Sequence, residues 1–447
     1  MSSATTSSAV SIILPHSAPG QRITPQEANA ATDLIGFAIL TAQIMGLLFL
    51  FHYYHLESPH FVIMSAMVFG AFLIHYWLPF RFKEMFWVAV SIGGSFVLLN
   101  HVVATLVLGA GLIIFLILRS PLKFQWRIVL TVAVFGLLMC GCTTNILTMI
   151  PRSFYAVFGG IFMFRIVIYI YDLAHAKNPP SLLSYLSYFF ILPNYYLPLF
   201  PVIDFQTMRT TYYRRDIHQI AQQGVHWMVR GAVQLMLYRV VLYLDDPFLP
   251  DRVTTLPKLI AAMVLTYLLY LNVSGKFHIV VGMLHLFGYD LPETNRRYLL
   301  ANSFLDYWRR INIYWKDFMV KIVYLPVYFK FRKKGDLGAQ ILGSAAVFAI
   351  SWFAHSYQSL WIQGQLSFSW TDTIFWLLLG ALVITNVIYE SRPKARRTSS
   401  TWRHRGLLAM RIFGTFAVIT VLWSLWTSPT FSSWIYLMTN WTRGTAQ

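Results

Sequence analysis

The chain has 447 residues, of which 57% are hydrophobic, 17% are aromatic and only 12% are charged. Because a soluble domain needs about a quarter of its residues charged to hydrate its surface, this composition excludes an ordinary water-soluble protein and predicts an outer surface that faces lipid. The formal net charge of +18, from 35 Lys and Arg against 17 Asp and Glu, indicates basic cytoplasmic loops that meet anionic headgroups, so no nucleic-acid partner is expected.

The first segment, 1–32, is polar and rich in Ser, Thr and Ala. It lacks the basic start of a cleaved signal peptide, so we predict a disordered tail over 1–32. The rest of the chain, 33–447, contains no repeat, low-complexity tract or long linker. We therefore predict a single multi-pass integral membrane domain over 33–447.

Apolar runs recur along that domain, and about twenty residues suffice to cross a hydrocarbon core roughly 30 Å thick. The candidate runs are 34–51, 61–78, 86–99, 101–118, 128–150, 154–171, 182–203, 224–244, 256–273, 339–361, 374–388 and 407–426. Several are short or interrupted, so we expect an all-α polytopic bundle of about 10–12 membrane elements, some of them re-entrant or interfacial. The segment 428–439 is too short to span and is expected along the interface.

Charged loops between these runs indicate the orientation. Residues 309–334 and 392–405 are rich in Lys and Arg, and two crossings separate them, so both suit the cytoplasmic side. The basic segment 209–215 precedes the acidic Asp245, Asp246 and Asp251 by one crossing. The acidic residues are therefore expected on the opposite face.

His355 is the most prominent polar residue inside an apolar run. Polar groups are costly within a membrane segment, so each one invites a functional hypothesis. Imidazole takes up and returns a proton near neutral pH, as a catalytic base must. We expect the neighbouring aromatic residues, Trp352, Phe353, Tyr357 and Trp361, to keep the ring uncharged. A packed, hydrogen-bonded core histidine is the alternative interpretation.

A second polar segment, 301–318, precedes the run that holds His355. It combines aromatic residues with a pair of arginines and Asn312, and it leads into 320–334, where lysines and arginines alternate with Tyr, Phe and Pro. This stretch suits an interfacial amphipathic helix whose cations reach the lipid headgroups. It equally suits the lip of a pocket that receives phosphates.

An ordered series of motifs runs from about residue 272 to 364. Ser274-Gly275, Gly282 and Leu286-Phe-Gly288-Tyr-Asp-Leu-Pro292 come first, followed by Phe304-Leu-Asp-Tyr-Trp308-Arg-Arg310-Ile-Asn312-Ile, Trp315-Lys-Asp317-Phe and Tyr324-Leu-Pro326. His355 then follows Asn312 by 43 residues. In order and spacing this series resembles the membrane-bound O-acyltransferases, whose central block reads FWRRWH/N-I. Asparagine at position 312 is more similar to the lipid- and protein-acylating branches.

The resemblance implies an acyltransferase fold with a catalytic core at about 272–364. It implies transfer of an acyl group from an acyl-CoA-type thioester to a hydroxyl or amine of a lipid, polysaccharide or protein. His355 would be the base, and Asn312 would donate to the thioester carbonyl or orient the acceptor. The residues expected to bind the donor are Trp308, Arg309, Arg310 and Lys316.

The same resemblance implies the co-substrate, the partners and the location of the protein. Acyl-CoA would be a co-substrate, with no permanently bound cofactor and no metal. Membrane lipids and an unidentified acceptor would be the partners, and the bacterial inner (plasma) membrane the location.

Two other functions stay open. Many spans interrupted at Gly and Pro are also typical of secondary transporters and channels, which would show paired inverted halves; no such halves are evident in the sequence. A non-catalytic scaffold for an envelope or lipid-synthesis complex would tolerate the loss of His355.

Overall fold

The computed structural model describes residues 33–144, 149–176, 178–196, 201–245, 250–391 and 401–443. The predicted tail over 1–32 lies outside these residues. So do Asp246 and residues 392–400 of the Lys- and Arg-rich segment 392–405. Within the described ranges every regular element is a helix, and the sole β feature is one isolated bridge between Tyr212 and Tyr289. The all-α class predicted from the sequence is confirmed.

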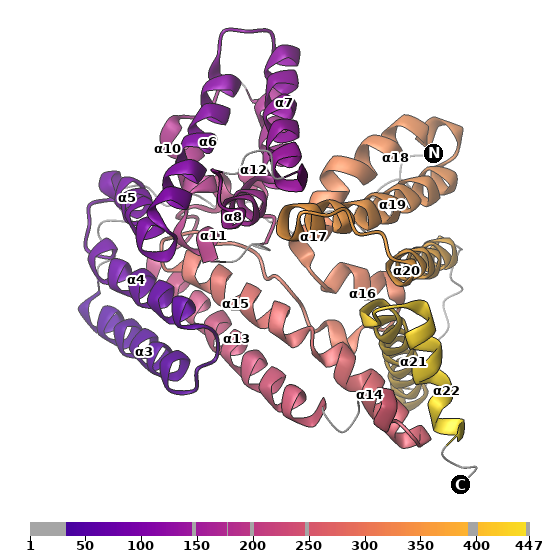
Figure 1. The fold of residues 1–447 in the computed structure, drawn as a ribbon. Coiled ribbons are helices and arrows are strands. Elements are labelled where there is room, and N and C mark those ends of the chain that lie inside the picture. Colours follow the sequence, from indigo (N-terminus) through magenta and orange to yellow (C-terminus); the bar gives the residue numbers. More distant parts are fainter. Residues whose placement is uncertain are drawn as a thin grey trace.

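The N-terminal helices pack against their neighbours in chain order and form one side of the molecule (Figure 1). They are α3 (Leu34–Tyr53), α4 (Pro59–His75), α5 (Phe80–Leu98), α6 (His101–Arg119) and α7 (Phe124–Thr144). Local chemistry sets their ends: the carboxylate of Asp33 accepts the first N–H groups of α3. The Lys83 ammonium donates to the carbonyls of His75 and Tyr76 at 2.7 and 2.9 Å, which satisfies the last turn of α4.

Short helices follow, and here one predicted span is wrong. The elements are α8 (Arg152–Phe162), α9 (Arg165–His175), α10 (Leu182–Phe189), α11 (Leu192–Tyr196) and α12 (Phe205–Thr211). The run 182–203 is thus broken into pieces and does not form one membrane helix. The Asn194 amide donates to the Phe189 carbonyl at 2.6 Å and so closes the end of α10, while Pro193 has no N–H with which to continue the ladder.

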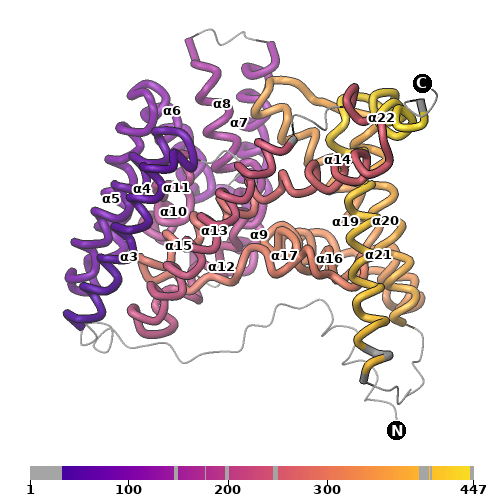
Figure 2. The backbone as a smooth tube through the Cα atoms, turned by 90° about the horizontal axis from the view of Figure 1, so that it is seen from below, coloured from indigo at the N-terminus to yellow at the C-terminus, as the bar shows by residue number. Residues whose placement is uncertain are grey.

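A close antiparallel pair, α13 (Ile217–Asp245) and α15 (Leu271–His285), lies at the centre of the molecule (Figures 1 and 2). Gly224 faces Gly282, and Gly231 faces Gly275. A Cβ atom added at Gly224 or Gly231 would lie 2.5 Å from the carbonyl oxygen of the facing glycine. The two backbones therefore touch, which small residues permit at membrane helix crossings.

The C-terminal helices form the other side of the molecule (Figure 2). The remaining elements are η2 (Pro250–Arg252), α14 (Leu256–Leu268), η3 (Tyr298–Leu300), α16 (Phe304–Arg310), α17 (Ile313–Met319), the π-helical turn η4 (Val320–Tyr324), α18 (Leu325–Phe331), η5 (Arg332–Lys334), α19 (Asp336–Gln363), α20 (Trp370–Glu390), α21 (Thr401–Thr427) and α22 (Phe431–Arg443). Helix α20 packs against both α19 and α21, and the short α16 packs against α20.

Seven helices in the described ranges are long and apolar enough to cross a membrane, or eight if the bent pair α8 and α9 forms one span. Large apolar side chains on these helices are exposed, including Leu116 at 64%, Val132 at 63% and Leu377 at 67%. Such side chains need lipid around them. The chain is therefore a multi-pass helical membrane protein, and its other predicted membrane elements are shorter helices, such as α4, or less apolar ones, such as α13.

The end of α15 is tied to the segment before α13 by buried charge. Asp290 is 5% exposed and accepts hydrogen bonds from Arg214 at 3.0 Å and from Arg215 at 2.6 Å. Burial alone would raise the pKa of Asp290, but the hydrogen bond and charge of Arg215, together with the charge of Arg214, outweigh it and lower the pKa below its ordinary value. The basic segment 209–215 thus has a structural role at this junction.

Replacing Asp290 with Asn should lower stability at neutral pH by about 1 to 2 kcal/mol, because the charge-assisted hydrogen bonds from the two arginines lose their ionised acceptor. The pKa of Asp290 is lower in the folded than in the unfolded chain, so its contribution is present above pH ~4. That contribution is lost as the pH falls through the folded-state pKa. Thermal unfolding of the detergent-solubilised protein should therefore show a smaller acid-induced loss of stability in Asp290→Asn than in the wild type. Asp251→Asn, in the exposed turn η2, should behave like the wild type.

Candidate functional site

His355 lies on α19 between two tryptophans from other helices. Its half-buried ring faces Trp376 of α20 and Trp426 of α21, with ring centroids 5.0 and 5.3 Å away. In the described part of the chain no hydrogen bond reaches the imidazole, and the Ser359 hydroxyl donates to the backbone carbonyl of His355 instead. An imidazole without a partner is free to accept a proton from a substrate.

One carboxylate holds both tryptophans. Asp372, in the first turn of α20, accepts the indole N–H of Trp376 at 3.1 Å and that of Trp426 at 2.7 Å. Both indoles are therefore fixed in rotation by the same atom, Oδ1. The walls around His355 thus depend on Asp372 as well as on the rings themselves.

The aromatic surroundings that we expected for His355 differ from those observed. Phe353 is 51% exposed, and Trp361 packs against Phe135 and Phe158. A helix turns through 3.6 residues, so Trp361, six positions after His355, points to another side of α19. The prediction that these two residues enclose His355 is wrong.

Asn312 directly precedes α17 and adopts the left-handed conformation, with φ 39° and ψ 62°. Asparagine tolerates this region better than most residues. Its side-chain oxygen accepts the N–H of Trp315 at 3.3 Å and caps the helix. Within the described ranges no hydrogen bond uses its side-chain N–H₂ group, which leaves an amide donor available to a ligand.

A tryptophan connects the element of Asn312 with that of His355. The Trp315 indole N–H donates to the Ser351 hydroxyl at 3.2 Å, and Ser351 precedes His355 by four residues, which is one turn on the same face of α19. The Asn312 and His355 side chains share no hydrogen bond or ring contact in the described chain. The hydrogen bond between Trp315 and Ser351 therefore connects the elements that carry the two predicted catalytic residues.

Trp308 provides a second connection to the same region. Its ring packs against Phe348 at 4.8 Å and meets Trp376 edge-on at 6.5 Å. Trp376 is one of the two rings that flank His355. Trp308 is thus part of the aromatic packing behind His355, whereas the sequence predicted a contact with the donor.

The three predicted donor-binding cations each face a carboxylate. Arg310 is 2.7 Å from Asp306 and Lys316 is 2.6 Å from Asp317, while Arg309 is 3.7 Å from Glu390. Arg309 is the one of the three whose donors are buried without a hydrogen bond, at Nε and Nη2. Burial lowers the pKa of Arg309 from its ordinary value in spite of Glu390 and Asp306.

A different group of cations is exposed and lacks carboxylate partners in the described ranges. It consists of Lys330, Arg332, Lys333 and Lys334, which we call the basic cluster. The basic cluster ends immediately before α19 begins. Helix α19 rises about 1.5 Å per residue, so His355 lies about 28 Å along the helix from Asp336. It is therefore near the end of α19 that is far from the basic cluster.

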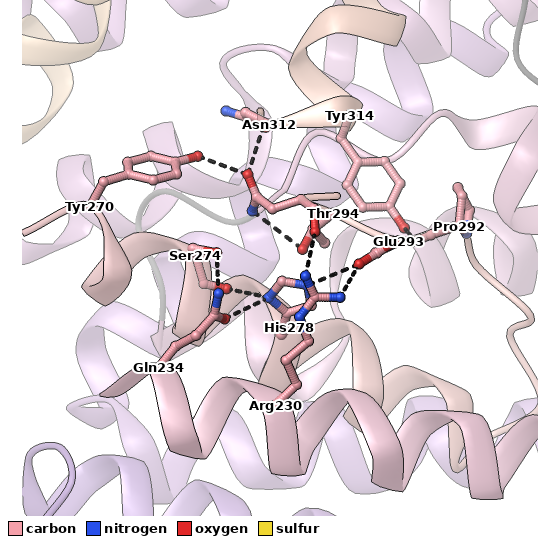
Figure 3. Close-up of polar contacts among 11 residues, drawn as sticks. Arg230, Gln234, Tyr270, Ser274, His278, Pro292, Glu293, Thr294, Asn312 and Tyr314 are labelled. Atoms are coloured by element: carbon pink, nitrogen blue, oxygen red, sulfur yellow. Dashed lines mark hydrogen bonds and ion pairs between the residues drawn. The ribbon is translucent and has the colours of Figure 1, made fainter. Parts of the chain in front are cut away.

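A buried polar network that was not predicted from the sequence lies between α13 and α15 (Figure 3). His278 is fully buried, and its Nδ1 lies 2.9 Å from the Gln234 side-chain oxygen and 2.8 Å from the Ser274 carbonyl. The Gln234 amide donates to the Ser274 hydroxyl at 3.0 Å. The other ring nitrogen, Nε2, has no hydrogen bond and is 3.8 Å from Glu293, which also pairs with Arg230.

The signal for this network was present in the sequence. Gln234 is a polar residue inside the predicted apolar run 224–244, the same criterion that drew attention to His355, and Ser274 and His278 follow directly after the predicted run 256–273. Ser274 and His278 are also one helical turn apart. In the described chain no three His, Cys, Asp or Glu side chains group as metal ligands.

Comparison with known proteins finds no family whose sequence model matches this chain and no curated protein that matches it significantly. The similarity to the membrane-bound O-acyltransferases therefore rests on the motifs between residues 272 and 364. What that similarity implies about activity stays a prediction.

Proposed function

We propose that this chain is a membrane-bound acyltransferase that moves an acyl group from an acyl-CoA-type thioester to a hydroxyl or amine. His355 would act as the base and Asn312 as a donor to the thioester carbonyl. The observation that carries the proposal is the unpartnered imidazole of His355, which is held between Trp376 and Trp426 on a membrane helix. A histidine with only a packing role usually forms a hydrogen bond through its ring, and His355 differs from the unpartnered His75 of α4 in being half-buried instead of fully buried.

The reaction balances with these two residues alone. The acceptor O–H or N–H gives its proton to His355 as its oxygen or nitrogen bonds to the thioester carbonyl carbon. The C–S bond then breaks, and the departing thiolate takes the proton from the imidazolium and leaves as the free thiol. The amide of Asn312 would donate to the carbonyl oxygen as negative charge develops, a contact worth about 3 kcal/mol.

The distribution of charge supports a two-sided arrangement of substrates. The phosphates of a CoA-type donor would bind the basic cluster, which is exposed and has no carboxylate partners in the described ranges. Because His355 lies nearer to the other end of α19, the acceptor would approach from the membrane or from the face opposite the basic cluster. This assignment favours the basic cluster over Arg310 and Lys316, whose charges are already paired.

The experiment that tests the proposal uses the full chain purified into lipid nanodiscs. Labelled acyl-CoA of several chain lengths is supplied with lipid, carbohydrate and peptide acceptors, and both free thiol and labelled product are measured. We expect thiol release that depends on the acceptor and matches product one to one. Solute flux in proteoliposomes without thiol release from any donor would overturn the proposal in favour of a transporter.

Neutralising two residues of the basic cluster should weaken donor binding. In Lys333→Gln/Lys334→Gln we expect the KM for acyl-CoA to rise roughly 3- to 10-fold, the effect of losing one or two exposed charge contacts, with kcat unchanged. Raising the salt concentration should reduce the difference from the wild type. Lys123→Gln, at an exposed lysine before α7, is the matched control, and an equal rise in KM there would contradict the specific role of the basic cluster.

A further inference from the structure

The side chain of Asn295 holds the backbone of Asn312. Asn295 is completely buried, and its side-chain oxygen accepts the backbone N–H of Asn312 at 2.8 Å and the hydroxyl of Tyr270 at 3.1 Å. A carbonyl-type oxygen has two lone pairs, so both are used. The Tyr270 hydroxyl thereby fixes the orientation in which Asn295 meets Asn312; Tyr270 and Asn312 are labelled in Figure 3.

The loop that carries Asn295 runs beside the start of α17. The N–H of Ile313 donates to the Thr294 carbonyl at 2.8 Å, and the N–H of Arg296 donates to the Arg310 carbonyl at 2.9 Å. These two bonds lie on either side of Asn312, and the bond that the Asn295 oxygen accepts from the Asn312 N–H lies between them. The left-handed backbone of Asn312, which is unfavourable for a residue with a side chain, is thus held from three points.

The same loop is anchored to the central helix pair by charge. Glu293 pairs with Arg230 of α13, and Arg230 also donates to the Asn295 carbonyl at 3.4 Å. Burial would raise the pKa of Glu293, but its contacts with His278 and Arg230 lower it below the ordinary value, so the carboxylate stays ionised. The ion pair connects the loop to α13, and His278, whose Nε2 is 3.8 Å from Glu293, connects it to α15. Among the described residues none of these three side chains forms a hydrogen bond or an ion pair with Asn312.

We propose that Asn295, oriented by Tyr270, is a positioning residue that holds the Asn312 carboxamide in place for acyl transfer. The proposal rests on the proposed function, because it assigns Asn295 no chemistry apart from that of Asn312. No other acceptor for the Asn312 backbone N–H is present among the described residues. Loss of the Asn295 side chain would therefore remove the middle one of the three bonds that hold the backbone from which the carboxamide projects.

A double-mutant cycle tests the proposal. In Asn295→Ala we expect kcat to fall about 10- to 100-fold, because a misplacement of about 1 Å costs up to 100-fold, with the KM for acyl-CoA changed less than about 3-fold. Asn312→Asp keeps the cap acceptor but removes the amide donor. If Asn295 acts through Asn312, adding Asn295→Ala to Asn312→Asp should cause no further loss. Multiplicative losses in the double variant would overturn the proposal.

Two further variants separate positioning from stability. Asn295→Asp keeps an oxygen acceptor at the same place and should restore kcat to within about 5-fold of the wild type. Tyr270→Phe, which leaves Asn295 in the chain, should lower kcat about 3- to 10-fold and should also add nothing to Asn312→Asp. Wild-type kcat in both Asn295→Ala and Tyr270→Phe would overturn the positioning role even if Asn312→Asp and His355→Ala are inactive.

The matched control is another buried asparagine far from this loop. Asn440 is 8% exposed, and its amide donates to the carbonyls of Pro250 and Val253. Asn440→Ala should leave kcat unchanged, so an equal loss there would show that the effect of Asn295→Ala is general instability. Full activity in both His355→Ala and Asn312→Asp would instead overturn the proposed function.

Discussion

His355→Ala is expected to lower kcat for acyl transfer by about 10²- to 10⁴-fold, the usual contribution of a positioned general base. No other histidine in the described chain lies between the two tryptophans held by Asp372, so no neighbouring imidazole replaces the lost one. The KM for acyl-CoA should change little, because the donor phosphates are expected about 28 Å away along α19. Steady-state release of free thiol in nanodiscs measures both constants.

Two controls separate the loss of the base from the loss of the fold. His355→Gln keeps a polar side chain of similar size between Trp376 and Trp426 but accepts no proton, so it should be as inactive as the alanine variant. His226→Ala removes an exposed histidine from the central helix α13 and should retain wild-type kcat. An active His355→Gln enzyme would show that proton transfer at this position is not needed.

The long membrane helices were largely predictable from apolar runs. The run predicted over 34–51 became α3 (Leu34–Tyr53), and that over 101–118 became α6 (His101–Arg119). Prediction failed over 182–203, where the same hydropathy covers two short helices. Hydropathy indicates that a segment prefers an apolar environment, but it does not indicate whether the segment forms one continuous helix. The hydrogen bond by which the Asn194 amide ends α10 is therefore not visible in it.

The candidate site was predictable in part. His355 and Asn312 were found as polar residues in aromatic or apolar surroundings, but Asp372, Trp376 and Trp426 were not, because they reach His355 from other helices. The contact between Trp315 and Ser351 is likewise a property of packing. The pairing of Arg310 with Asp306 could have been predicted from the sequence, because the two residues are four apart and share one face of a helix.

Gly282→Ala is expected to destabilise the protein by about 1 to 3 kcal/mol, the typical cost of forcing an extra carbon into a packed contact. The new Cβ would lie 2.5 Å from the Gly224 carbonyl oxygen, which is backbone and has no rotamer through which to move away. Helices α13 and α15 would have to separate, and the bonds among Gln234, Ser274 and His278 would lengthen with them. Thermal unfolding of the purified protein measures the effect.

Gly231→Ala should cost a similar amount, because its Cβ would lie 2.5 Å from the Gly275 carbonyl oxygen. The double variant Gly231→Ala/Gly282→Ala should cost less than the sum of the two, since one separation of the helices accommodates both methyl groups. Gly136→Ala on α7 is the matched control: no atom lies within 4 Å of its added Cβ, so alanine should be neutral or stabilising by up to about 1 kcal/mol. If Gly282→Ala unfolds at the same temperature as Gly136→Ala, the backbones of α13 and α15 do not touch. The helices would then be too far apart for the hydrogen bonds of the polar network between them.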